Sequence, residues 1–179
     1  PNKWHSSNFL ANLDKMDYPD LTYFADKWES QVNTEAAAIE SIISLNNYDC
    51  HDNIFVTGRD FKVKTNFKIE NLLDDKHKFL TLWVGLYRSD GIYCHGSIKK
   101  IASAAGRHSE VLIYPELGLL PGGYKISAGI WDPKVNKFLA YSHGIYSFNM
   151  ISEKHDHGTV YLEHSWNWSI PKGGGHNDR

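Results

Sequence analysis

The 179-residue sequence lacks most features that would place it in a specialised class of protein. Its two cysteines, Cys50 and Cys94, are too few for a disulfide-stapled secreted fold, and we expect both to be free thiols in a reducing compartment. No apolar run approaches the roughly 18 residues that cross a bilayer. No signal peptide opens the chain, although a chain that begins at Pro1 says little about location. The formal net charge of -2 gives no basic bias toward nucleic acid.

Motifs for catalysis and for metal binding are also missing. The sequence has no G-x-x-x-x-G-K-[ST] loop, no H-E-x-x-H and no G-x-S-x-G. The run His155-Asp156-His157 is interpreted as a solvated loop, because no third ligand accompanies it. Asp90 and Asp132 both stand in turn signals, where aspartate is favoured for its bonds to the local backbone. We therefore expect no catalytic residue, no metal and no cofactor.

The sequence is rich in aromatic residues, at 13%, and in segments where apolar and polar residues alternate. The alternation is clearest over 61–70 and 79–88, and the hairpin signal Ser89-Asp90-Gly91 leads into a return strand over 92–97. Further strands are expected over 34–45, where the alanine-rich composition also favours a helix, and over 53–58, 109–114, 119–132 and 158–166. Residues 138–150 are expected to form two short strands or one bent strand, and 99–107 a polar connection. This pattern predicts an all-β fold, an immunoglobulin-like β-sandwich of two antiparallel sheets.

Three regions are expected along the chain. Residues 1–27 are aperiodic and predict a largely irregular linker or connecting arm. Residues 28–170 form the β-sandwich. Residues 171–179, which contain three consecutive glycines, predict a disordered tail.

The strand expected over 119–132 carries the strongest signal of a binding surface. Its apolar residues alternate with Lys125, Ser127, Gly129 and Trp131, so the second set faces away from the core. Small residues beside a large indole predict a shallow, open surface with aromatic walls, which suits a sugar ring. We call this predicted surface the aromatic shelf, and its expected residues are Trp83, Tyr87, Tyr93, His95, Ser127 and Trp131, with Arg88, Lys125 and His143 beside them. Exposed aromatic residues would fit equally well with a face that another domain or subunit covers.

Several segments, taken in order, resemble one family, the C-terminal carbohydrate-binding domain of Wzt, the nucleotide-binding protein of ABC transporters that export O-antigen polysaccharide. The most specific are an "LLPG-x-Y" strand entry at Leu119–Tyr124 and a later "L-x-H-x-W" strand at Leu162–Trp166. The similarity spans roughly residues 28–166 and also includes Lys27-Trp28…Glu35, Phe55-Val56-Thr57-Gly58 and Tyr87-Arg88-Ser89-Asp90-Gly91.

The resemblance implies an immunoglobulin-like module that recognises the modified non-reducing end of a lipid-linked glycan and couples chain termination to export. It implies a cytoplasmic location at the inner membrane, a homodimer with an exchanged terminal strand, and an ATPase domain and a membrane subunit as partners in the full-length protein. The family fixes no binding residues by a motif. The cations Arg88 and Lys125, with His95 and His143, would suit an anionic terminal sugar of the Kdo type, and methyl or methyl-phosphate caps stay open.

Two other functions remain open on the sequence. The first is a small glycan-active enzyme, which needs two carboxylates facing one cleft. The second is a dimerisation or interaction domain whose aromatic face is an interface. The resemblance favours a non-catalytic glycan-binding module over both.

Overall fold

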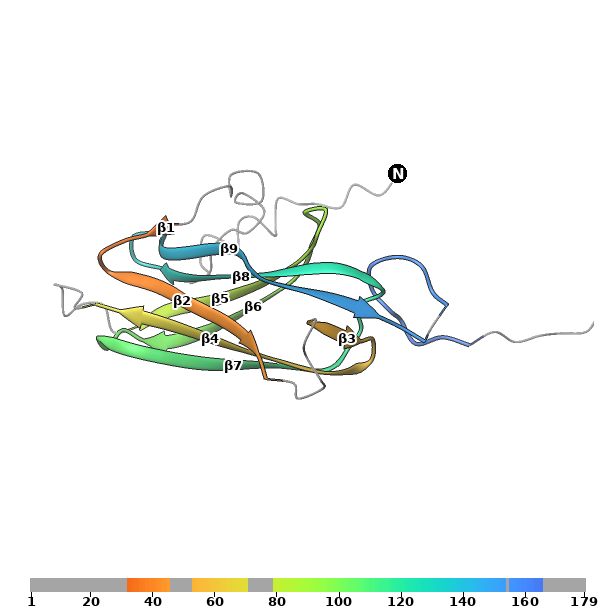
Figure 1. Cartoon of the computed structure of the whole chain (residues 1–179). Helices are drawn as coiled ribbons and strands as arrows, with labels where there is room; N and C mark the ends of the chain where they lie inside the picture. The colour runs from red at the N-terminus through yellow and green to blue at the C-terminus, as the bar shows by residue number, and fades with distance from the viewer. Residues whose placement is uncertain (1–31, 46–52, 71–78, 154, 166–179) are drawn as a thin grey trace, which may run out of the picture.

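The computed structural model describes residues 32–45, 53–70, 79–153 and 155–165. Over these residues the chain is all-β and forms two stacked sheets, a β-sandwich, as predicted (Figure 1). The strands of the described residues are β1 (Val32–Asn33), β2 (Ala37–Ser44), β3 (Ile54–Val56), β4 (Arg59–Ile69), β5 (Phe79–Arg88), β6 (Tyr93–Ala102), β7 (Gly106–Leu117), β8 (Gly122–Asp132) and β9 (Lys137–Ile151).

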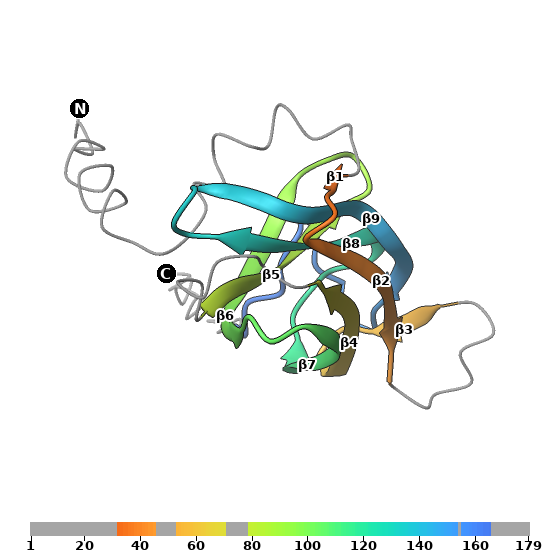
Figure 2. The ribbon, with the colours of Figure 1, turned by 90° about the vertical axis from the view of Figure 1, so that its left-hand side faces the viewer.

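The larger sheet has six strands in the order β1-β9-β8-β5-β6, and β3 also pairs with β9. The smaller sheet has three strands in the order β2-β4-β7. Every pairing between the described strands is antiparallel except that of β3 with β9. Viewed along the strands, β2, β4 and β7 form a separate layer beside β5, β8 and β9 (Figure 2). Among the described strands the chain changes sheet at every connection except β5–β6 and β8–β9, and the β6–β7 connection joins an edge strand of one sheet to an edge strand of the other.

The main core lies between the sheets and comes from alternate positions of the strands. Strand β4 shows the predicted period of two, with its apolar set buried and its lysines on the outer face of the smaller sheet. Strand β5 contributes Leu80, Leu82, Val84 and Leu86, and β8 contributes Tyr124, Ile126, Ala128 and Ile130. The face of β8 that was predicted to point into the core does so.

The prediction of which β2 residues share a face is wrong, because the strand contains a β-bulge. Strict alternation would put Ile39 and Ile43 on one side, but the pairing register shifts between Ile39 and Ser41. Ile39 and Ile42 are therefore buried, whereas Ile43 is 44% exposed. One extra residue in a strand moves every later side chain to the other face.

Two predicted segment boundaries are wrong. The connection expected over 99–107 is largely strand, because β6 continues to Ala102 and β7 begins at Gly106. The strand expected over 158–166 does not form in residues 158–165, where Val160 makes an isolated bridge to Leu119. Phe138–Met150 lies within one long strand, β9, and residues 143–145 of this strand have no partner in β8, around Gly144 at φ +58°.

The predictions for residues 1–27, for the tail from Pro171 and for Cys50 lie outside the described residues, while Cys94 is a free thiol.

Candidate functional site

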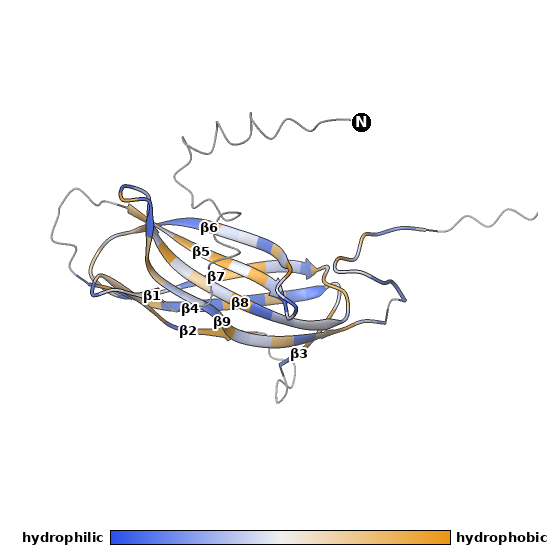
Figure 3. Cartoon of the chain, turned by 90° about the horizontal axis from the view of Figure 1, so that it is seen from above, coloured by the Kyte–Doolittle hydropathy of each residue, from blue (hydrophilic) through white to orange (hydrophobic). Residues whose placement is uncertain are grey.

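Most of the predicted site residues do share one face, the outer face of the six-stranded sheet. The register pairs Trp83 with Gly129, Tyr87 with Lys125, and Thr81 with Trp131, so these side chains leave the sheet on the same side. Figure 3 looks onto this sheet from above and shows hydrophobic and hydrophilic positions alternating along its strands. The parity predicted from the sequence is therefore confirmed for the two indoles.

The prediction that these indoles are open to solvent is wrong. Trp83 is 0% exposed and Trp131 is 1% exposed. The ring of Trp83 lies 5.9 Å from that of Tyr141 and 6.2 Å from that of Phe138, and Phe138 also meets Trp131 edge-on at 5.0 Å. Trp83, Tyr87 and Tyr141 form a second small core, which we call the outer aromatic cluster, with Val32 and Phe138 packed against it.

Glycines in the sheet explain why the aromatic rings lie flat against it instead of projecting into solvent. A Cβ on Gly85 would fall 2.2 Å from Cζ2 of Trp83, and a Cβ on Gly129 would fall 2.4 Å from Cε1 of Phe138. On the edge strand, a Cβ on Gly96 would meet the hydroxyl of Tyr93. Each ring thus occupies the space above a glycine on the pleated surface. The low floor predicted from Ser127 and Gly129 exists, but aromatic rings of the same chain fill it.

Ser127 is 0% exposed and serves a hydrogen-bond network rather than an open floor. Its Oγ accepts the Gly144 amide at 2.9 Å and lies 3.0 Å from Nδ1 of His143. The Tyr141 hydroxyl lies 3.0 Å from the same Nδ1. Two hydroxyls at Nδ1 favour the tautomer with its proton on Nε2, so the network orients the exposed His143 ring and leaves Nε2–H as a donor.

The network and its surroundings shift the pKa of several groups. Burial, and then the nearby Lys125 ammonium, lower the pKa of His143, so the ring stays neutral at pH 7. Burial raises the pKa of Tyr87 and of Tyr141. Burial also raises the pKa of Tyr93. All three phenols are therefore neutral donors at physiological pH.

Two predicted site residues lie away from this face. A bulge at Cys94 places His95 opposite Leu86, on the inner side of the sheet, where its Nδ1 lies 3.3 Å from the Tyr114 hydroxyl of the other sheet. Arg88 pairs in register with the buried Tyr124, and its Nη1 donates to Thr159 Oγ1 at 3.0 Å. The predictions that His95 belongs to the shelf and that Arg88 lies beside it are therefore wrong.

What remains accessible is a small patch around Tyr87, which we call the outer patch. The Tyr87 ring, itself 6% exposed, lies 5.1 Å from the ring of Tyr93 and 5.2 Å from that of His143. Tyr93 is 39% exposed, His143 is exposed and Lys125 is half-buried. The outer patch thus offers one aromatic face, one imidazole and one ammonium on a rigid sheet. Sequence reasoning missed Tyr141, although it stands two residues before the predicted site residue His143 and an alternating strand would place both on one face.

The predicted turn roles of the two aspartates are confirmed. Asp132 Oδ1 accepts the Lys134 amide at 2.9 Å, and Asp90 Oδ1 accepts the Ile92 amide at 3.3 Å. The Nε–H of Arg88 donates to Asp90 at 2.9 Å, and this bond lowers the pKa of Asp90.

Within the described ranges, no three histidine, cysteine or acidic side chains are grouped as metal ligands would be. The same ranges hold no helix able to span a membrane.

Comparisons with known proteins give one strong likeness, and it is structural. No protein-family model matches the sequence, and no curated protein does. A crystal structure of the C-terminal domain of Wzt aligns at a TM-score of 0.63 and 15% identity, over 80% of this chain and 90% of that one. A CARDB domain of the PF1109 protein from Pyrococcus furiosus (TM-score 0.39, 9% identity, 68% and 100% coverage) and a β-glucuronidase from Bacteroides uniformis (0.43, 15%, 60% and 14%) are too distant to support an argument. The chain therefore shares the β-sandwich fold of the Wzt C-terminal domain.

Proposed function

We propose that this sandwich is a non-catalytic carbohydrate-binding module that recognises the modified non-reducing terminus of an O-antigen polysaccharide. The observation that carries the proposal is the outer patch, where Tyr93, Lys125 and His143 surround a buried ring on a rigid sheet. The fold shared with the Wzt C-terminal domain, together with the motifs in Leu119–Tyr124 and Leu162–Trp166, supports it.

Each group of the outer patch has a role in sugar recognition. The half-exposed ring of Tyr93 stacks on the C–H face of a pyranose, and the Nε2–H of His143 donates to a ring hydroxyl. The ammonium of Lys125 pairs with a carboxylate of an anionic, Kdo-type terminal sugar through a charge-assisted hydrogen bond. The outer aromatic cluster beneath holds these groups in place, which lowers the entropy lost on binding.

Replacement of Tyr93 by alanine is expected to weaken binding of capped polysaccharide by about tenfold to a hundredfold, as removal of an aromatic platform worth ~1.5–3 kcal/mol would. Isothermal titration calorimetry with the capped polymer measures the loss. The matched control is Phe79→Ala on the neighbouring strand β5, which removes a 50% exposed ring. Phe79 lies eight residues along β5 from Tyr87, the partner of Tyr93, and so roughly 26 Å away at ~3.3 Å per residue. Equal affinity in the Tyr93 variant and the unchanged chain would remove the outer patch as the site.

A catalytic role for the Ser127–His143 pair has less support. A serine nucleophile must reach its substrate, whereas Ser127 is 0% exposed and already accepts the Gly144 amide. The proposal therefore assigns the pair to positioning the imidazole.

We also propose that the module works as a homodimer with an exchanged C-terminal segment, in the cytoplasm beside the ATPase domain and membrane subunit of an exporter. In the single chain Val160 is 52% exposed and Leu162 is 75% exposed, and residues 161–165 form no strand. Apolar side chains on an extended, solvent-exposed segment suit insertion into a partner subunit.

Analytical ultracentrifugation at micromolar concentration is expected to give twice the chain mass of 20.5 kDa. Leu162→Asp should shift the mass toward that of one chain, because an inserted carboxylate is costly to bury. A monomer across the micromolar range, or a dimer that the Leu162 variant leaves unchanged, contradicts exchange of this segment.

A further inference from the structure

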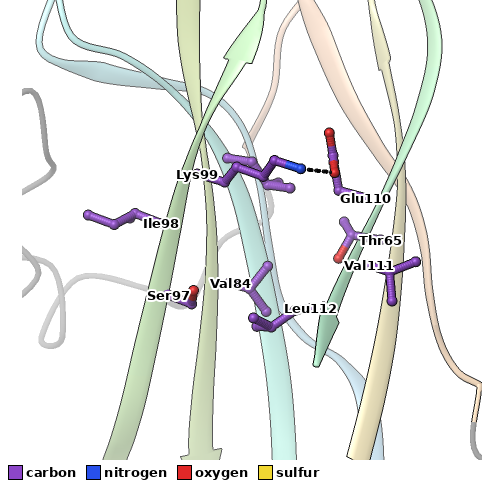
Figure 4. A pocket seen from close by; sticks show the side chains of 9 residues that line it. Thr65, Val84, Ser97, Ile98, Lys99, Glu110, Val111 and Leu112 are labelled. Carbon is purple, nitrogen blue, oxygen red and sulfur yellow. Dashed lines mark hydrogen bonds and ion pairs between the residues drawn. The ribbon is translucent and has the colours of Figure 1, made fainter. Parts of the chain in front are cut away.

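The sandwich is open along one side, between the edge strands β6 and β7. A half-open cavity of about 220 Å³ lies there, away from the outer patch (Figure 4). Strands of both sheets contribute to it, and the residues that line it are Thr65, Leu82, Val84, Ser97, Ile98, Lys99, Glu110, Val111 and Leu112. The cavity is therefore a place where the main core reaches solvent.

The floor of the cavity is apolar. Leu82 and Val84 of β5 are 3% and 5% exposed and belong to the main core, and Leu112 of β7 packs against that core from the opposite sheet. Figure 4 shows Val84 and Leu112 approaching each other between the strands. An aliphatic group placed here would contact core side chains on both sides.

The mouth of the cavity is polar at positions where a sandwich normally places apolar residues. Ser97 and Lys99 of β6 lie opposite Val84 and Leu82, and Glu110 of β7 lies opposite the buried Thr65, so all three belong to the inner faces. Lys99 Nζ and Glu110 Oε2 form an ion pair that spans the two sheets (Figure 4). The side chain of Lys99 is 59% exposed and that of Glu110 is 30% exposed.

A second polar contact links the same two strands. His95 of β6 and Tyr114 of β7 lie 3.3 Å apart, Nδ1 to hydroxyl. His95 precedes Ser97 by two residues on the inner face, and Tyr114 follows Leu112 by two. The open side thus carries two links, with Ser97 and Leu112 between them. Inward charges that discourage edge pairing would explain the ion pair alone, but they do not require an accessible cavity beside it.

We propose that this cleft binds a compact neutral aliphatic group that carries a hydroxyl. A hydroxyl can donate to Glu110 and accept from Lys99 without breaking their neutral pair. A carboxylate near Lys99 would meet the charge of Glu110, and an ammonium near Glu110 would meet that of Lys99. At about 30 Å³ per water-sized group, 220 Å³ admits roughly seven non-hydrogen atoms.

Two sources present this chemistry, namely the methyl-bearing edge of a 6-deoxy sugar and a short alkanol. The test titrates the ¹⁵N-labelled chain with methyl α-L-rhamnopyranoside, 1-hexanol, hexanoate and hexylamine, and follows backbone amide shifts. At least one neutral probe should shift the amides of β6 and β7 around Ser97 and Leu112, with about tenfold higher affinity than both charged probes. Which neutral probe binds identifies the source.

Two substitutions on β6 locate the binding. Ser97→Leu fills the cavity from its mouth and should abolish the shifts, whereas Lys100→Ala alters an exposed residue of the same strand that does not line the cavity and should leave them intact. Both variants should keep the fold, seen from their dispersed amide spectra, and keep binding at the outer patch. The proposal is overturned if no neutral probe binds, if the charged probes bind as well, or if Ser97→Leu binds like the unchanged chain.

Discussion

Replacement of Trp83 by alanine is expected to lower the free energy of unfolding by about 3–5 kcal/mol, the range for deleting a large aromatic side chain from a core. The indole is 0% exposed and contacts the rings of Tyr87, Phe138 and Tyr141. Its loss leaves a cavity that the sheet beneath cannot close, because backbone hydrogen bonds fix the strands. Urea denaturation followed by far-UV circular dichroism measures the change.

The matched control is Tyr93→Ala on the same face. Tyr93 is 39% exposed, so its removal should cost about 1 kcal/mol. Removal of a buried ring lowers the free energy of unfolding more than removal of an exposed one. If Trp83 were exposed for ligand stacking, both substitutions would therefore lower the free energy of unfolding by a similar, small amount. A cost no greater than that of Tyr93→Ala would contradict the assignment of Trp83 to the outer aromatic cluster.

Replacement of Gly85 by alanine is expected to cost about 2–4 kcal/mol, an unusually large penalty for one added methyl group. The new Cβ would fall 2.2 Å from Cζ2 and 2.3 Å from Cη2 of Trp83, so the indole must leave its site. Gly85 lies mid-strand in β5 between β6 and β8, so the backbone cannot withdraw from the clash.

A double-mutant cycle separates this clash from a backbone effect of glycine. If the indole is the obstacle, the Trp83→Ala/Gly85→Ala chain should be more stable than the sum of the single costs predicts, by about 2 kcal/mol or more. Simple additivity of the two costs would show that Gly85 is needed for some reason other than the ring above it.

Strand positions and side-chain parity could be predicted because the period of two is a property of the local sequence. The alternation around Ser127 correctly assigned the two faces of β8, and the turn signal at Asp90 correctly placed the β5–β6 hairpin. Bulges defeated the same logic. One extra residue at Cys94 put His95 on the inner side, and the shift after Ile39 turned Ile43 outward.

The solvent exposure of the outer-face aromatic side chains could not be predicted from the alternation of faces along a strand. It depends on which rings lie over which glycines. The sequence around Gly129 indicates a low floor, but nothing local states that Phe138 fills it. The cleft between β6 and β7 was missed for a related reason. Lys99 falls in the connection that the sequence predicted over 99–107, and its ion pair with Glu110 depends on how two edge strands from different sheets face one another.

The most direct test of the account is an amide-resolved titration of the ¹⁵N-labelled chain with O-polysaccharide that carries its native terminal cap, beside the same polymer without the cap. Binding at the outer patch predicts shifts for Tyr93, Lys125 and His143 with the capped polymer, and at least about tenfold weaker effects with the uncapped one. Equal shifts with both polymers, or shifts that leave these three amides unmoved, would contradict recognition of a capped glycan end at this face.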